Sequence, residues 1–277
     1  MALAEDPDRY RAPALDKGLD ILELLAGADA GLTQADIAKR LDRSPNEFYR
    51  MLDRLVRRGY VCRHDGDRYA LTLKLFGLAQ FHAPIRRLVS FATPIMREFS
   101  AYTHQACHLA VYDRGHVVVI AQQESPTYWG MSIRVGSRIS LYNTGSGHVL
   151  MAFRSEADRN MMISEYEQSS EDQKKPDHLD QRIADIQARG YEMMDSLQTA
   201  GIRNVSAPVR APDGHAIAAL TCPYIRPINL TGVPDFEDVI ARVVSSAKAL
   251  SDRACGATAA DGNAGDDDAD RYASASD

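Results

Sequence analysis

The stretch from Leu32 to Leu71 constrains the fold of this chain more than any other part. It predicts, in order, a helix, a tight turn, a second helix and a short hairpin. Apolar residues recur at helical spacing in both helices, so each should bury one face. This order of elements is typical of a winged helix-turn-helix, whose second helix can enter the major groove of double-stranded DNA.

Local signals predict where these two helices begin. Thr33 is a good N-cap, and Asp36 follows three residues later. Ser44 caps the second helix, Pro45 takes its first position, and Glu47 repeats the capping-box spacing. A capping side chain satisfies backbone N–H groups that have no partner inside the helix. The turn between the helices therefore falls at residues 42–45.

The hairpin and the charge distribution support the same interpretation. Two short alternating runs, 60–63 and 68–71, surround an Asp65-Gly66 pair typical of a tight turn. Net charge is −6 overall, but residues 33–74 hold ten Lys or Arg and six Asp or Glu, a local charge of +4. Residues 252–277 hold two Arg and seven Asp, a local charge of −5. A local basic face is what contact with phosphates requires, whatever the sign of the whole chain.

After residue 72 the pattern predicts an α+β arrangement. Helices are expected over 72–81 and 84–103, with Pro94 as a possible kink. From residue 105 the periodicity changes, and an α+β domain with a largely antiparallel sheet is expected. Its expected strands are 106–112, 116–122, 131–135, 191–195, 206–210 and 216–223, and its expected helices are 147–153, 156–167, 179–189 and 236–253.

These patterns divide the chain into five expected parts. They are a disordered arm (1–13), a winged helix-turn-helix DNA-binding domain (14–75), linker helices (76–103), an effector-binding domain (104–253) and a disordered acidic tail (254–277). The tail is expected to be disordered because it is acidic and of low complexity.

Composition excludes several classes of protein. No window approaches about 18 consecutive apolar residues, so no transmembrane helix and no membrane partner are expected. The N-terminus lacks the basic start and apolar core of a secretory signal. The four cysteines have no CxxC spacing and are expected to be reduced thiols. We therefore expect a cytoplasmic protein.

The sequence resembles the IclR family of bacterial transcriptional regulators, over roughly residues 14–251. Five stretches, in order and spacing, carry the resemblance: ALDKGLDILELLA, GLTQADIAKRLDRSPNEFYRMLDRLVRRGYV, YALTLKLFGLA, VGSRISLYNTGSGHVLMAF and ARGYEMMDSLQTAGIRNVSAPVRAPDGHAIAALTC. The resemblance implies a winged helix-turn-helix, a linker helix and a C-terminal effector domain with a GAF/PAS-like fold. It implies a homodimer or a tetramer built from dimers, a pseudo-palindromic operator, and a small organic acid or aromatic metabolite as effector.

The predicted DNA-binding surface centres on the start of the second helix. Arg50 matches the family's arginine at that point and can fork onto guanine, and Asn46 can bind adenine. Glu47 stands where many relatives carry a small or β-branched residue, so the operator sequence cannot be taken from them. For any single arginine the alternative is a solvated side chain or an intramolecular ion pair. The residues expected near base edges are Ser44, Asn46, Glu47, Tyr49 and Arg50, those expected near phosphates are Arg43, Arg54, Arg57, Arg63 and Arg68, and Thr33 and Gln34 complete the surface.

The predicted effector site centres on the glycine-rich turn 144–147. Backbone N–H groups at a helix start favour a carboxylate. In the family this turn forms one side of the effector pocket, and Thr221 corresponds to a hydroxyl position on the facing strand. Pro208 and Pro223 replace polar or cysteine positions of relatives, which argues against a glyoxylate-like ligand. The expected effector is an aromatic or otherwise bulky carboxylate. The expected lining is His108, Trp129, Met131, Tyr142, Asn143, Gly145, Ser146, Gly147, Pro208, Thr221 and Pro223, with ordinary packing as the alternative for Trp129 and Met131.

Other functions have weaker support in the sequence. The run His104–His108 suggests a metal site, but alternation on a strand would put Cys107 and His108 on opposite faces. Catalysis could use Cys107 with His108 or Ser146 with His148, but neither pair has an evident orienting acid. We therefore expect no enzyme activity, no metal and no cofactor. The remaining alternative is a small-molecule-binding or catalytic module whose helical N-terminal part mediates protein contacts.

Overall fold

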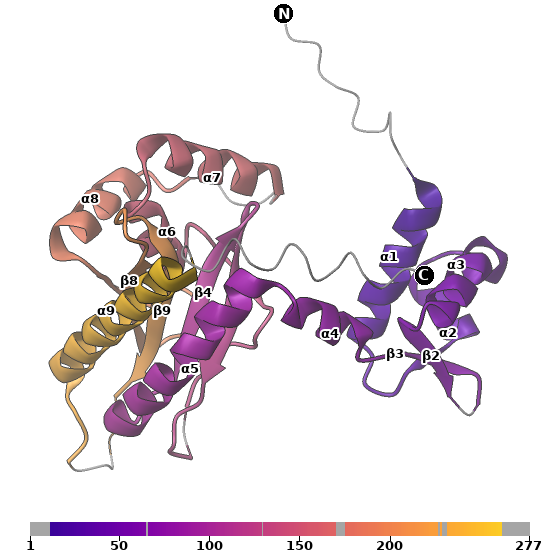
Figure 1. Cartoon of the computed structure of the whole chain (residues 1–277), viewed down its shortest axis with the longest axis horizontal. Helices are drawn as coiled ribbons and strands as arrows, with labels where there is room; N and C mark the ends of the chain where they lie inside the picture. Colours follow the sequence, from indigo (N-terminus) through magenta and orange to yellow (C-terminus); the bar gives the residue numbers. More distant parts are fainter. Residues whose placement is uncertain are drawn as a thin grey trace, which may run out of the picture. The chain divides into compact units, whose positions relative to one another are not determined.

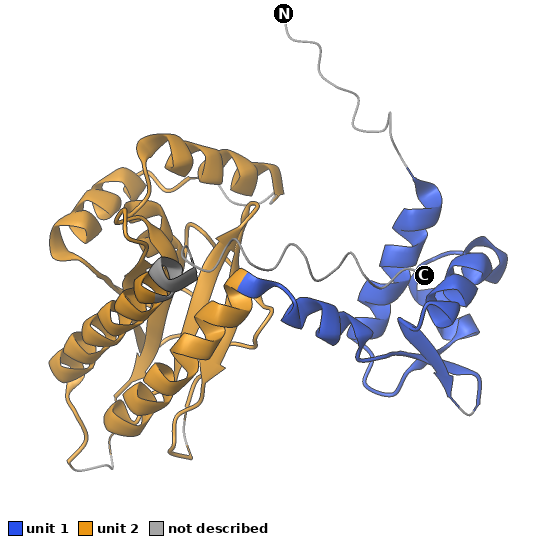
Figure 2. Ribbon diagram, in the orientation of Figure 1, with its two compact units in different colours: residues 1–83 blue, residues 84–277 orange. Residues whose placement is uncertain are grey.

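The computed structural model describes residues 12–64, 66–128, 130–169, 175–226, 228 and 232–261. The chain divides into two compact units, residues 1–83 and residues 84–277 (Figure 2). Most of the expected N-terminal arm, the acidic tail from residue 262, Asp65 and Trp129 lie outside the described residues.

The first unit is a winged helix-turn-helix with a small antiparallel sheet of order β1-β3-β2. Its helices bury Ile21, Ile37, Phe48 and Leu52, each no more than 1% exposed, in one core. Strand β1 was not expected; Leu32 pairs with Tyr69 of the hairpin and ties the first helices to it. The elements are α1 (Pro13–Ala26), β1 (Leu32–Thr33), α2 (Gln34–Arg40), α3 (Pro45–Arg57), β2 (Val61–His64) and β3 (Arg68–Leu71).

Helix α4 (Lys74–Gln80) follows the hairpin and buries none of its residues. Its apolar side chains are nevertheless large: Phe76 is 63% exposed, and the flanking Leu73 and Phe81 are 82% and 79% exposed. An apolar helix without a buried face is unusual in an isolated chain, because such surface is normally covered by protein. The helix therefore presents an uncovered apolar face.

The second unit is built on a sheet of order β6-β5-β4-β9-β8-β7, in which the neighbouring strands run antiparallel. Two strands contain register shifts, between Leu109 and Ala110 and between Val209 and Arg210. The strands are β4 (Cys107–Asp113), β5 (His116–Gln123), β6 (Arg138–Ile139), β7 (Glu192–Asp195), β8 (Ile202–Arg210) and β9 (Ala216–Ile225).

Helices cover both faces of this sheet (Figure 1). Helices α5 (Ala83–Thr103) and α9 (Phe236–Asp261) lie side by side on one face and share a core with the strands. The helices α6 (Gly145–Ala152), α7 (Glu156–Ser169) and α8 (Leu179–Arg189) pack on the other face in a second core. The α+β architecture with an antiparallel sheet agrees with the prediction.

Four details differ from the expectations. Residues 131–135 form no strand; Gly136, at φ +87°, turns the chain before the short β6. Strand β8 begins at Ile202 because it pairs with both β7 and β9. Helix α5, expected as a linker, buries Phe99 and Met96 in the core of the second unit. Helix α9 continues through residue 261, eight residues beyond the expected end, into the alanine-rich start of the tail.

Candidate functional site

Helix α3 exposes a polar face and buries the opposite one. Phe48 and Leu52 point into the core, whereas Asn46, Tyr49 and Arg50 are exposed near the helix start. Tyr49 is 55% exposed. These side chains meet the first requirement for reading base edges, because a recognition helix contacts bases through exposed residues near its N-terminus.

Two residues nominated for base contacts are already engaged in capping. Glu47 Oε1 accepts hydrogen bonds from the Ser44 N–H at 3.2 Å and from the Ser44 hydroxyl at 2.9 Å. These bonds hold the pKa of the Glu47 carboxyl below its usual value. Glu47 Oε2 also lies 3.6 Å from Lys17 Nζ. Ser44 and Glu47 therefore start the helix, and a contact with bases would require them to exchange these partners.

Thr33 plays the same part in α2: its hydroxyl accepts a hydrogen bond from the Asp36 N–H at 3.1 Å. The neighbouring Gln34 is half-buried at the start of that helix.

The arginines nominated for phosphates are mostly paired within the chain. Their partners are Asp20 for Arg43 (3.3 Å), Asp53 for Arg57 (2.8 Å), Asp67 for Arg63 (2.6 Å) and the Gly31 carbonyl oxygen for Arg68 (3.1 Å).

Arg50 and Arg54 differ from these arginines. Both are exposed on α3, and neither guanidinium group makes a hydrogen bond or an ion pair with any described residue. An unpaired guanidinium keeps its donors available for a guanine edge or a phosphate. Arg50 and Arg54 are therefore the strongest candidates on this surface for contacts with DNA.

The second unit contains a cavity of about 640 Å³ beside the glycine-rich turn. It lies among β4, the residues before β6, the turn that opens α6, the loop after β7, and strands β8 and β9. Seven of the residues nominated for the effector line it: His108, Met131, Asn143, Gly145, Ser146, Thr221 and Pro223.

Three nominated residues do not line this cavity. The Tyr142 side chain is not part of the cavity lining, and its hydroxyl donates to Glu167 Oε1 at 2.8 Å. Gly147 faces the protein, where an added Cβ would overlap the Leu141 carbonyl oxygen. Pro208 is buried on β8. It pairs with Ala219 of β9, which belongs to the core formed with α6. Trp129 lies outside the described residues.

A chain of buried hydroxyl groups forms one wall of the cavity. The Ser146 hydroxyl lies 2.8 Å from that of Thr221, which donates to Ser206 at 2.7 Å. Ser146 Oγ is also 3.4 Å from His108 Nε2. Burial lowers the pKa of His108 to about 4, so its imidazole is neutral at pH 7. This wall therefore offers hydroxyl groups and a neutral imidazole to a ligand.

The start of α6 adds backbone donors beside these hydroxyls. Thr144 caps the helix by accepting from the Gly147 N–H at 3.1 Å. The N–H groups of Gly145 and Ser146 have no acceptor among the described residues. Gly145 also packs so closely that an added Cβ would lie 2.5 Å from Ser206 Oγ. Free N–H groups at a helix start are suited to an anion such as a carboxylate.

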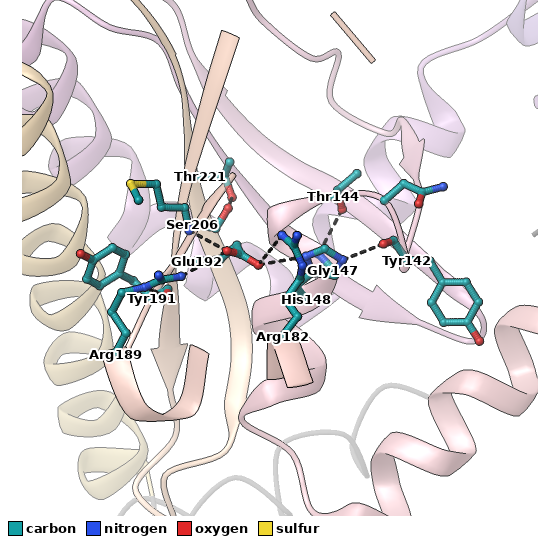
Figure 3. A network of polar contacts seen from close by, with 12 residues as sticks. Tyr142, Thr144, Gly147, His148, Arg182, Arg189, Tyr191, Glu192, Ser206 and Thr221 are labelled. Carbon is teal, nitrogen blue, oxygen red and sulfur yellow. Dashed lines mark hydrogen bonds and ion pairs between the residues drawn. The ribbon is translucent and has the colours of Figure 1, made fainter. Parts of the chain in front are cut away.

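A buried ionic network lies behind the same turn (Figure 3). Glu192, at the start of β7, is only 2% exposed. Its carboxylate contacts His148 Nδ1 at 3.1 Å and Arg182 at 3.4 Å through Oε2, and Arg189 at 3.3 Å and the Met193 N–H at 2.8 Å through Oε1. Sequence reasoning missed this network, because its residues come from three separate elements.

Sequence reasoning also missed much of the cavity lining. The loop 196–199 closes one side, and Gln198 donates from Nε2 to the Asn143 carbonyl oxygen at 2.9 Å. No local sequence pattern predicts that contact. The only local signal is the largely polar composition of residues 196–199, which follow the predicted strand 191–195. Thr144 of the predicted turn also lines the cavity, and the other missed lining residues are Ser132, Ile133, Arg138, Ile139, Ser140, Ile202 and Asn204.

The residues suggested for metal binding or catalysis are separated in space or engaged elsewhere. Cys107 contributes to the core beneath α5 and α9, whereas the neighbouring His108 faces the cavity. Within the described ranges, no group of three or more His, Cys, Asp or Glu could hold a metal ion. Ser146 bonds to Thr221, and His148 bonds to Glu192, so these two do not form a nucleophile–base pair. None of the described helices has both the length and the apolar character needed to cross a membrane.

Both units match families of known proteins. Residues 14–65 match the IclR helix-turn-helix domain, and residues 83–251 match the family described as bacterial transcriptional regulator IclR C-terminal. The chain is 30% identical over 226 residues to the HTH-type transcriptional regulator BhcR of Paracoccus denitrificans, covering 79% of this chain and 78% of that protein. It is 22% identical over 227 residues to the transcriptional repressor IclR of Escherichia coli, covering 79% of this chain and 82% of that protein.

Solved structures share this fold. An IclR homolog from Microbacterium hydrocarbonoxydans, solved in complex with 4-hydroxybenzoate, aligns with a TM-score of 0.72 and 20% identity, covering 87% of this chain and 98% of that one. The Thermotoga maritima IclR aligns with a TM-score of 0.67 and 22% identity, with the same coverage. At these identities the structures support the fold alone.

Proposed function

Because the chain belongs to the IclR family of bacterial transcriptional regulators, we propose that a small organic acid bound in the cavity of its second unit controls its affinity for an operator. The observation that carries this proposal is the wall formed by the free N–H groups of Gly145 and Ser146 and the hydroxyls of Ser146 and Thr221. Such donors suit one carboxylate, which would be held at the helix start.

An aromatic or otherwise bulky acid fits the rest of the cavity. Its volume of about 640 Å³ lies within the range of sites that bind drug-sized ligands. Apolar side chains face the carboxylate end from several elements: Met131, Ile133, Ile139, Leu197, Ile202 and Pro223. A two-carbon acid would leave most of this apolar surface without contact. The 4-hydroxybenzoate complex of a relative with the same fold is in line with this ligand class.

The DNA contacts would come from α3. Arg50 and Arg54 are exposed cations of its polar face whose guanidinium groups have no partner among the described residues, and Asn46 and Tyr49 lie near them on the same helix. We place Arg50 on a base edge and Arg54 on a phosphate, since residues near the start of a recognition helix reach the bases. The arginines paired within the chain would contribute mainly to the general affinity for DNA.

The exposed apolar face of Leu73, Phe76 and Phe81 supports a homo-oligomer. A two-fold symmetric dimer would bind two half-sites of a pseudo-palindromic operator. Changing Phe76 to Asp is expected to convert the dimer to a monomer, which light scattering after size-exclusion chromatography measures. An unchanged mass would remove α4 from the interface. The relatives named above are transcriptional regulators. On that ground we assign no catalytic role to this chain, and we assign it a cytoplasmic location.

The test uses two measurements on the full-length protein. Fluorescence anisotropy with the intergenic DNA beside its own gene should show salt-dependent binding that an effector changes. A thermal-shift screen should compare benzoate, phenylacetate and 4-hydroxybenzoate with glyoxylate and pyruvate. Stabilisation by the small polar acids alone would overturn the ligand class, and absence of DNA binding even at low salt would overturn the regulatory function.

A further inference from the structure

The ring of His148 lies between two groups that accept hydrogen bonds. Its Nε2 is 2.6 Å from the Tyr142 carbonyl oxygen, and its Nδ1 is 3.1 Å from Glu192 Oε2 (Figure 3). A carbonyl oxygen cannot donate, and neither can an ionised carboxylate. A neutral imidazole carries only one N–H, so it could satisfy only one of these contacts. Both contacts form together only if a second proton is shared between His148 and Glu192.

The surroundings favour the ionised form of Glu192. Burial alone would raise the pKa of its carboxyl, but the hydrogen bond and charge of His148, the charge of Arg182 and the Met193 N–H together hold that pKa below its usual value. His148 is 3% exposed and sits in the first turns of α6. With the extra proton on the imidazole, the contact is a buried ion pair that joins α6 to the edge strand β7.

This pair supports the turn that forms the floor of the cavity. The carbonyl group that His148 holds belongs to Tyr142, directly before Asn143 and the helix start. On the other side, the Cγ of Glu192 would lie 3.5 Å from a Cβ added at Gly145, so the carboxylate side chain packs against the turn. The ion pair thus contacts the turn from behind, while the cavity lies in front of it.

We propose that His148 and Glu192 are positioning residues for the effector site, and that the proton they share holds the 143–146 turn with its N–H groups directed to the cavity. This inference rests on the proposed function. An imidazolium behind the helix start also adds positive charge near the place of a bound carboxylate. Loss of the proton would free either the Tyr142 carbonyl or the Glu192 carboxylate, and the affinity for an anion would fall.

Other charged or titratable groups face this pair or its helix. They are Arg182, Arg189 and Asp185 from α8, its N-cap residue His178, His108 from β4, and the Tyr142–Glu167 contact with α7. Arg182 and Arg189 both contact the Glu192 carboxylate. The exposed His178 provides a matched control, because it lies near the same carboxylate but contacts neither ring nitrogen of His148 nor the turn.

The experiment follows the histidine rings and backbone amides of the full-length protein by nitrogen-15 NMR from about pH 5 to about pH 8. At the acidic end both ring nitrogens of His148 should carry protons, and the amide signals of Gly145 and Ser146 should shift with the midpoint of that ring. In Glu192→Gln the midpoint should move to lower pH, and both amide signals should move with it. In His178→Gln nothing should change.

A neutral His148 ring throughout this range would overturn the inference, and so would amide signals that do not respond when the ring titrates. These two measurements need no ligand and no variant. A final arm titrates 4-hydroxybenzoate by calorimetry, and its affinity should fall several-fold as the ring loses its proton, but not in His148→Gln. Absence of any binding would instead count against the proposed ligand class, while the ring and amide signals still decide this inference.

Discussion

The hydroxyl oxygens of Ser146 and Thr221 lie 2.8 Å apart, although 75 positions separate the two residues in the chain. One belongs to the first turn of α6 and the other to strand β9. Their contact joins the helix start to the centre of the sheet, and it lies on the wall of the cavity. A change at either residue should therefore alter ligand binding directly.

Replacing Thr221 with Val removes the hydroxyl and keeps the shape of the side chain. It should weaken binding of an aromatic acid about tenfold, because one hydrogen bond contributes on the order of 1 kcal/mol and the partner hydroxyl of Ser146 is left buried. Calorimetry measures the affinity. The matched control is Thr93→Val on the exposed side of α5, whose hydroxyl donates to the Val89 carbonyl oxygen and to no other described residue. Equal affinities in both variants would remove Thr221 from the site.

Replacing Arg50 with Ala should weaken the preference for the operator over unrelated DNA and leave the fold intact. Loss of a bidentate contact with guanine costs about 1–3 kcal/mol. Arg54→Ala should weaken binding to all sequences. It should also reduce by about one the slope of log affinity against log salt concentration. Arg57→Ala is the control for specificity: Arg57 is paired with Asp53, and its loss should leave the preference for the operator unchanged. Gel shifts that show unchanged specificity in Arg50→Ala would contradict this assignment.

His108 should make the protein less stable in mild acid. Its pKa lies near 4 in the folded protein because of burial, against an ordinary value of 6.5. As pH falls from about 6.5 to about 4, the unfolded chain binds a proton that the folded chain does not, so the free energy of unfolding falls, by at most roughly 3 kcal/mol. Urea unfolding of His108→Gln should show a smaller loss over this range. The exposed His82 is the control, and equal slopes for all three proteins would refute this account.

Replacing Gly147 with Ala should destabilise the second unit by about 2 kcal/mol, because the added Cβ overlaps the backbone of Leu141. Gly18→Ala is the matched control: it lies in helix α1 with no atom within 4 Å of the added Cβ, and alanine favours a helix. That variant should be neutral or slightly more stable. Thermal unfolding separates the two, and equal melting temperatures would show that α6 can move away from Leu141.

The helix-turn-helix could be predicted because its signals are local. The caps at Thr33 and Ser44 and the stripe of Phe48 and Leu52 depend on residues a few positions apart, and the structure contains each of them. The partners of the charged side chains could not be predicted. Arg43 reaches Asp20, which is 23 positions away, and a sequence pattern does not distinguish such a partner from a phosphate.

The cavity shows the same limit. Ser146 and Thr221, which the sequence predicts for the effector site, both line it, because the glycine turn and the facing strand are recognisable. Tyr142 was nominated because it is aromatic and adjacent to the turn, but its ring packs edge-on against Tyr166 of α7. The loop 196–199 was missed because only its tertiary contact with Asn143 brings it to the site.

Helix α5 begins at Ala83, where the first unit ends, and its 21 residues span about 30 Å. Near its far end Phe99 is fully buried, and the Met96 carbonyl oxygen accepts a hydrogen bond from the Cys107 thiol. Cys107 precedes His108, which lines the cavity. A straight, rigid helix of this length would convert a small tilt at one end into a larger displacement at the other end. If a ligand tilts it by about five degrees at the end near the cavity, its other end moves by roughly 3 Å. This is about the length of one base-pair step, so in the proposed dimer such a displacement would change which phosphates the two recognition helices reach.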